Sequence, residues 1–191
     1  YLRERLFDTY LGTVDDSPDQ WRWSRTGPDG RWTPEPRGRE RAFAKYDGVL
    51  AGLARGTIPA FVNFGEGYQE QLGVMAYQRT LDRQLLSLLD WPVWDSVTSE
   101  FEAALTDSVI AAAVAQLPPE YLAGGASFLA AGLRARRDLL PKAAQGLYRL
   151  INQEAAFFGT PGADTVTVTR MQDGSVELAF QDGLRRVYAP G

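Results

Sequence analysis

The spacing of hydrophobic residues changes near residue 159 of this 191-residue chain. Before that point apolar residues recur at helical intervals, as Leu140, Ala144 and Leu147 do. After the turn formers of residues 159–162 the interval becomes two, so that apolar side chains alternate with polar ones. The sequence therefore predicts an α+β fold: a mainly helical body over 1–158, followed by an antiparallel β-meander over 159–191.

Helical spacing and end signals divide the body into segments. Gly12 ends the first segment, Asp90 and Thr106 suit helix N-caps, and Pro118 with Pro119 stops a helix. Pro141 predicts a break or kink in the longest segment, which two helices could share. The expected helices cover 2–11, 49–53, 80–89, a segment from 90, a segment from 106, and 127–157. A β-hairpin is expected at about 20–34, and the meander strands near 165–171, 175–180 and 184–189.

Composition excludes several classes of function. Lys and Arg number 20 against 24 acidic residues, and the net charge of -4 gives no reason to expect a nucleic-acid partner. The chain has no His and no Cys, which excludes Ser-His and Cys-His nucleophile pairs, zinc sites and disulfides within it. Any chemistry must use carboxylates, Lys, Arg, Tyr or hydroxyls.

The apolar runs and the first residues indicate whether the chain spans a membrane and whether it is part of a larger protein. The longest apolar run, 109–117, is too short to cross a bilayer, so we expect no membrane span here. Leu2, Leu6 and Tyr10 already follow helical spacing directly after Tyr1. We therefore expect a fragment of a larger protein, whose partner is either the missing N-terminal part of the same protein or another protein.

The segment 12–48 combines an acidic loop, three tryptophans and an Arg-rich stretch. It contains Gln20-Trp21-Arg22-Trp23 and then Pro36-Arg37-Gly38-Arg39-Glu40-Arg41-Ala42-Phe43. These two motifs resemble a kinase-like region related to CotH-type spore-coat kinases and secretory-pathway kinases, found in bacterial proteins associated with the outer membrane. The resemblance implies a kinase C-terminal-lobe-like body and a location in the cell envelope or periplasm, although composition alone leaves the compartment open.

The resemblance also implies roles for individual residues. Asp15 would be the catalytic base that aligns the acceptor hydroxyl, and Glu40 would hold Mg²⁺ on ATP. Arg39, Trp21 and Trp23 would contact the substrate or nucleotide. Mg²⁺ and ATP are expected as cofactors only if the chain is an enzyme.

The acidic chemistry of both motifs departs from the family pattern. In the first loop Thr13 stands in place of Asp, Asp16 in place of Arg and Ser17 in place of His, and in the second motif Gly38 and Glu40 replace two Asp residues. The departures favour a pseudokinase-like, non-catalytic binding or scaffold fragment. The alternative is the C-terminal lobe of an atypical Mg²⁺-dependent kinase or phosphotransferase.

Each candidate residue also has a structural interpretation. Asp15 suits a turn, Glu40 suits a surface ion pair, and the tryptophans suit packing across the hairpin. The basic residues 134, 136, 137 and 142 suit a solvated helix face with acidic neighbours such as Asp138. The scaffold function predicts a large apolar or aromatic patch on the surface of the chain.

Overall fold

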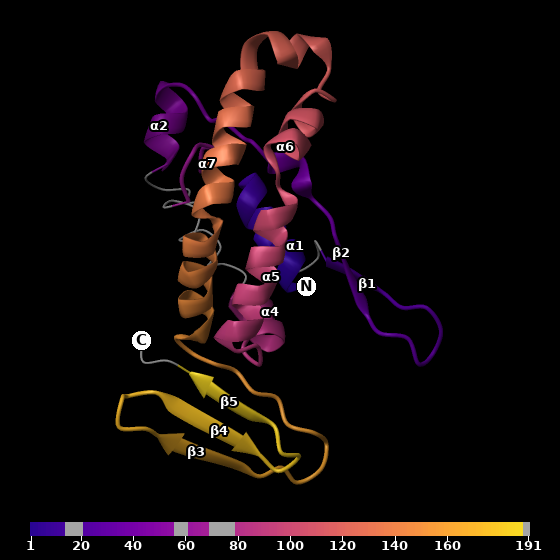
Figure 1. Cartoon of the computed structure of the whole chain (residues 1–191), viewed down its shortest axis with the longest axis vertical. Helices are drawn as coiled ribbons and strands as arrows, with labels where there is room; N and C mark the ends of the chain where they lie inside the picture. Colours follow the sequence, from indigo (N-terminus) through magenta and orange to yellow (C-terminus); the bar gives the residue numbers. More distant parts are fainter. Residues whose placement is uncertain (14–20, 56–60, 69–78, 189–191) are drawn as a thin grey trace.

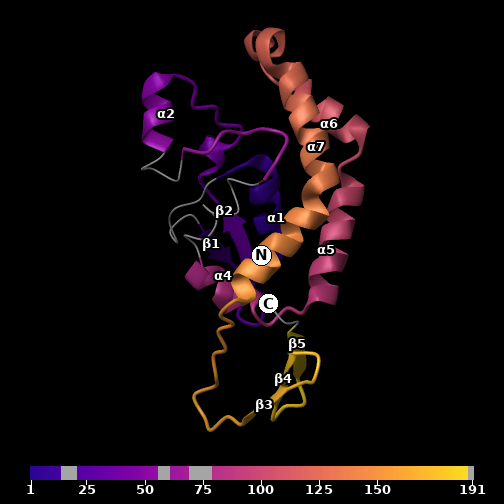
Figure 2. The same ribbon diagram turned by 90° about the vertical axis from the view of Figure 1, so that its left-hand side faces the viewer.

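The computed structural model describes residues 1–13, 21–55, 61–68 and 79–188. It has an N-terminal two-stranded hairpin, a helical middle and a C-terminal three-stranded antiparallel sheet, which confirms the α+β class (Figure 1). The sheet lies at one end of the molecule, beyond the last turns of the long helix (Figure 2).

The first helix, α1 (Leu2–Leu11), ends at Gly12 as the sequence predicts. Gly12 adopts the left-handed conformation with φ 74°, which glycine reaches without steric cost, and its N–H bonds back to the helix. Leu2, Leu6 and Tyr10 are buried on one face of this helix. This face packs against α5 and α7, so α1 lies inside the helical body.

The described helices beyond α1 follow the predicted order. Asp90 caps α5 by accepting from the Val93 N–H at 3.4 Å, and Thr106 caps α6 through the Val109 N–H at 3.2 Å. The helices are α2 (Val49–Arg55), α4 (Arg79–Leu86), α5 (Trp91–Ala104), α6 (Asp107–Val114) and α7 (Pro119–Asn152).

The long helix α7 differs from the prediction. It begins at Pro119, eight residues earlier than expected, and continues through Pro141 as a single helix. Pro119 suits the first helical position, where its missing N–H would have no partner anyway. Pro141 lies on the exposed side, while the neighbouring Leu140 and Ala144 are completely buried. Packing of that buried face therefore keeps the helix continuous despite the lost hydrogen bond.

The N-terminal hairpin pairs β1 (Trp21–Ser24) with β2 (Thr33–Pro36). The return strand starts later than predicted and contains two prolines, which a strand at a sheet edge tolerates. Trp21 faces Pro36 and Trp23 faces Pro34, so the tryptophans do not pair across the hairpin. Trp21 is instead buried against Tyr1, which agrees with the expected role in core packing. Residues 39–41 form a short 3₁₀ helix, η2 (Arg39–Arg41).

The C-terminal sheet is the predicted meander, with order β3-β4-β5. Its strands are β3 (Val166–Arg170), β4 (Val176–Phe180) and β5 (Arg185–Tyr188). Phe157, just after α7, packs its ring on Phe180 and Tyr188, and the Tyr188 hydroxyl donates to the Ser87 carbonyl. These contacts attach the sheet to the base of the helical body. Within the described ranges, no helix is long and apolar enough to span a membrane.

Candidate docking site

Helix α1 is anchored by a buried ion pair. The Arg5 guanidinium donates to the Asp82 carboxylate at 2.9 and 2.8 Å, and the Tyr1 hydroxyl donates to the same carboxylate at 2.6 Å. Burial opposes the charge of Arg5, but the attraction of Asp82 outweighs it and raises the pKa of Arg5 above its ordinary value. Two segments distant in sequence, α1 and α4, are thus joined inside the core.

Arg136 caps the other end of α1. Its Nε donates to the Tyr10 carbonyl at 2.7 Å and its Nη2 to the Thr9 carbonyl at 2.6 Å. Its Nη1 donates to the carbonyls of Gly65 and Gly67 at 3.2 and 2.6 Å. The last carbonyls of a helix lack partners within the helix, and a cation at this end also meets the negative pole of the helix dipole. The guanidinium therefore joins α1, α7 and residues 65–67.

Arg136 is completely buried, contrary to the expected solvated face. Its guanidinium lies 4.1 Å from the Tyr68 ring centre and 5.0 Å from that of Phe64. Burial lowers the pKa of Arg136 to about 10, which leaves it cationic at neutral pH. Arg136 falls in helical register with the buried Leu133 and Leu140, and that spacing was the available sequence signal.

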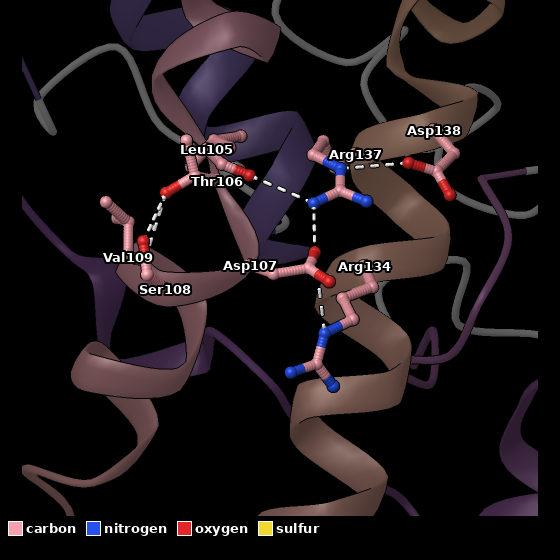
Figure 3. A network of polar contacts seen from close by, with 8 residues as sticks. All are labelled: Leu105, Thr106, Asp107, Ser108, Val109, Arg134, Arg137 and Asp138. Atoms are coloured by element: carbon pink, nitrogen blue, oxygen red, sulfur yellow. Dashed lines mark hydrogen bonds and ion pairs between the residues drawn. The ribbon is translucent and has the colours of Figure 1, made fainter.

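A polar network fixes the corner between α5 and α6 against α7 (Figure 3). Arg137 donates to the Leu105 carbonyl at 3.2 Å, where α5 ends, and pairs with both Asp107 and Asp138. Asp107 also lies 3.6 Å from the Arg134 Nε. The hydrogen bond from Arg137 lowers the pKa of Asp107. The predicted acidic neighbour Asp138 is confirmed, and the network sets the position of α6 relative to α7.

An apolar groove runs beside α6 and the first half of α7. It consists of two adjoining hollows of about 390 and 400 Å³, which share Phe43, Leu117 and Leu129 as walls. The first hollow extends to Phe7 and Tyr10 of α1. The second hollow extends to Tyr121 and Phe128, near the start of α7. We call this continuous feature the α6–α7 groove.

The walls of the α6–α7 groove leave large apolar side chains in contact with solvent. Tyr121 is 64% exposed, Val109 48% and Phe128 46%. Lys45 places its ammonium 5.4 Å from the Phe128 ring centre and pairs with Asp47 at 3.1 Å, which puts charged groups at the rim. An apolar surface with a charged rim is typical of protein-binding surfaces.

Phe43, in the groove wall, has a strained backbone conformation. Its φ is 60°, a left-handed conformation that bulky residues rarely adopt. The Phe43 N–H donates to the Leu11 carbonyl at 3.2 Å, and its ring packs edge-on against Phe64. Strained residues persist where the surrounding contacts fix them, and they gather at functional sites. The contacts with Leu11 and Phe64 fix Phe43 in this wall.

Tyr10 is a further unusual group in the groove wall. Its hydroxyl is buried and has no hydrogen-bond partner within the described part of the chain. Burial raises the pKa of Tyr10 to about 12, so the hydroxyl keeps its proton at neutral pH. The lining therefore contains a donor without an acceptor among the described residues. From its spacing, Tyr10 was expected only to lie on the apolar face of α1.

The residues singled out by the kinase resemblance are not among those that line this groove, or they fall outside the described ranges. Asp15 lies outside the described residues, so its role stays a prediction. Glu40 is exposed on η2, and among the described residues no group of carboxylates gathers as a metal site would require. Its role as a Mg²⁺ ligand also stays a prediction.

The three predicted contact residues already have partners within the chain. Arg39 pairs with Glu4 at 2.6 Å and with Asp8 at 2.8 Å, which holds η2 on α1. Trp21 is buried and its ring centre lies 4.6 Å from that of Tyr1, while Trp23 stacks on the same ring at 6.0 Å. Their contact with substrate or nucleotide stays a prediction.

A larger hollow of about 760 Å³ lies between the C-terminal sheet and residues 157–165. Its two carboxylates already serve local turns. Asp164 accepts from the Thr160 N–H at 2.6 Å, and Asp182 accepts from the Leu184 N–H at 3.0 Å. Because both carboxylates are used in hydrogen bonds of the chain itself, we assign this hollow a structural role.

Comparisons with protein-family models, with curated proteins and with solved structures give no match for this chain. The assignment of a function therefore depends on the residues and their geometry. The α6–α7 groove was not predicted as a site because its walls come from α1, residue 43, α6 and α7, which are distant in sequence. Exposed apolar and aromatic side chains line the groove, and the large patch expected of a scaffold stays a prediction.

Proposed function

We propose that this chain is a non-catalytic binding or scaffold module, pseudokinase-like in its sequence motifs, which docks an apolar segment of a protein partner in the α6–α7 groove. The observation that carries the proposal is the continuous, almost wholly apolar groove, with exposed Val109, Tyr121 and Phe128 in its walls. Fully burying one such side chain stabilises a complex by about 1.5–3 kcal/mol. Aromatic side chains in pockets often dominate binding energy.

Helix α2 supplies a second exposed apolar surface. Val49, Leu50 and Leu53 are 82%, 83% and 72% exposed, and they lie on neighbouring turns of one short helix. Single exposed apolar residues need no explanation, but three neighbours exposed to this degree favour an interaction surface. Two separate apolar surfaces support a module that contacts more than one segment of its surroundings.

The pseudokinase part of the proposal, and the kinase C-terminal-lobe character of the body, depend on the two sequence motifs. The framework residues of these motifs serve packing here: Trp21 lies on Tyr1, and Arg39 binds Glu4 and Asp8 of α1. These contacts support motifs retained for their architecture. The alternative, an atypical Mg²⁺-dependent phosphotransferase, requires Asp15 and Glu40 to act on one nucleotide.

A thermal-shift titration separates the two functions. The chain is melted with ATP alone and with ATP and Mg²⁺, beside the Glu40→Ala variant. If the chain is a binding module without nucleotide chemistry, neither ATP nor ATP with Mg²⁺ changes the Tm of the unmodified chain or of the variant. A Tm increase that requires Mg²⁺ and disappears in Glu40→Ala supports the phosphotransferase, because a ligand stabilises the state that binds it.

A further inference from the structure

The outer edge of β3 is open. The sheet order β3-β4-β5 leaves β3 with one neighbour, and all five of its residues are exposed. The Thr165 carbonyl and the Met171 N–H are both used in hydrogen bonds towards β4, to Gln181 and Ser175. Because backbone groups alternate in direction along a strand, Val166, Val168 and Arg170 direct their N–H and C=O groups to the open edge. Three of the five residues therefore have backbone N–H and C=O groups that face away from the sheet.

This edge lacks the features that keep other edges from pairing. Residues 166–170 read Val-Thr-Val-Thr-Arg, with no proline and no lysine, and their register with β4 is continuous without a bulge. Alternating Val and Thr favour the extended conformation. Arg170 is the charge in this strand, and it lies at the end. Figures 1 and 2 both place β3 on the side of the sheet away from the helical body, so the edge is accessible.

The apolar face of the sheet also continues to this edge. Val166 and Val168 pair with Phe180 and Leu178 across the β3–β4 ladder, so the four side chains share one face. Leu178 is 6% exposed, whereas Val166 is 42% exposed and Val168 65%. A strand added next to β3 would extend this face and cover the two valines.

We propose that β3 pairs antiparallel with β3 of a second copy of this chain, around a two-fold axis at Val168, to form one six-stranded sheet. The sequence is self-complementary in this register. Val168 lies opposite its own copy and exchanges both backbone hydrogen bonds with it, and Thr167 lies opposite Thr169. Val166 lies opposite Arg170, which completes the ladder at both ends.

Charge does not oppose this register. Arg170 is the charged residue of the strand, and in the two-fold pair it lies opposite Val166 of the other copy, so like charges are not directly opposed. Two strands of this length bury less than the roughly 1,200 Å² of a stable dimer, so the complex should dissociate on dilution.

Sedimentation equilibrium of the full chain tests the pairing, up to about 1 mM because the interface is small. We expect a monomer–dimer equilibrium that Val168→Lys abolishes, since two ammonium groups would then lie opposite each other. Val187→Lys is the matched control. Val187 is 53% exposed on β5, and this variant should dimerise like the unmodified chain. A monomer at every concentration, or a dimer that survives Val168→Lys, overturns the proposal.

Cysteine crosslinking tests the register, since the natural chain has no Cys. Opposed residues in a hydrogen-bonded antiparallel pair have Cα atoms about 5.5 Å apart, within the range that disulfides span. Val168→Cys should form a disulfide-linked dimer under mild oxidation, and Thr167→Cys should not, because Thr167 faces Thr169. Equal crosslinking of the two variants would contradict this register. The groove plays no part in either experiment, so the two proposals can fail separately.

Discussion

Arg5 and Asp82 form a two-bond ion pair with only about 1% of either side chain exposed. The pair links the first helix of the chain to α4, across 77 residues of sequence. A buried pair of this kind adds little net stability compared with apolar residues of the same shape, but removal of one partner leaves a charge without compensation. Its main effect is to specify which faces of α1 and α4 meet.

The Asp82→Ala variant should therefore lose about 3–5 kcal/mol of unfolding free energy, measured by urea denaturation. The control is Glu100→Ala, which removes the partner of Arg3 in a pair whose side chains are 61% exposed, and it should cost less than about 1 kcal/mol. The double variant Arg5→Met, Asp82→Leu should recover much of the loss. A loss in Asp82→Ala no larger than in the control would contradict the role of the pair.

Arg136 supports a second prediction, about the end of α1. Arg136→Lys keeps the charge but has fewer donors and no planar fork, so it cannot reach the four carbonyls that Arg136 binds. Buried carbonyls left without partners cost about 1–3 kcal/mol each. Urea denaturation of Arg136→Lys should give a loss of at least about 2 kcal/mol. Arg149→Lys, at an exposed position of the same helix, should lose much less, and equal losses would refute the capping role.

Tyr10 supports a prediction about alkaline pH. Burial raises the folded-state pKa to about 12, above the ordinary value of 10.0, so the folded chain retains a proton that the unfolded chain releases. The stability from this group is complete below pH 10 and is lost as the pH rises through about 12. The unfolding free energy should therefore decrease with pH above 10, and Tyr10→Phe should make that decrease smaller. An identical pH profile for the two proteins would contradict this cause.

The same variant tests the unpartnered hydroxyl at neutral pH. Removal of a buried hydroxyl that has no hydrogen-bond partner relieves its desolvation cost and leaves the ring contact with Phe101 intact. Tyr10→Phe should therefore be neutral or stabilising by up to about 1 kcal/mol in a thermal or urea melt. A clear loss of stability would mean that the hydroxyl has a partner.

The spacing of hydrophobic residues along the sequence predicted much of the fold. The change of interval near residue 159 predicted the meander and its turns, because a half-buried strand and an amphipathic helix distribute apolar residues differently. The helix ends predicted at Gly12, Asp90 and Thr106 also agree with the structure. Pro141 does not divide α7 into two helices, because the cost of an internal proline is local, whereas the packing that keeps α7 continuous involves the whole body.

The candidate site was harder to predict because it is made by tertiary contacts. Arg136 has the helical spacing of the buried residues of α7. Its basic neighbours in sequence nevertheless suggest a solvated face, because charged side chains are rarely buried without partners and the sequence does not reveal the carbonyls that Arg136 binds. Phe43 had no sequence signal for a positive φ. The α6–α7 groove depends on how α6 packs on α7, where Ile110 and Val114 share a buried cluster with Leu133, and no local pattern in the sequence records that contact.

The most direct test of the docking proposal is site-specific photo-crosslinking in the cell that makes the protein. A benzophenone side chain at Tyr121, in the groove, should give one discrete protein adduct that disappears when Leu129→Glu is added to the groove wall. The same group at Trp32, which is 57% exposed on the hairpin loop outside the groove, is the control and should give none. No adduct at position 121, or an adduct equal to the control and unaffected by Leu129→Glu, would contradict the account.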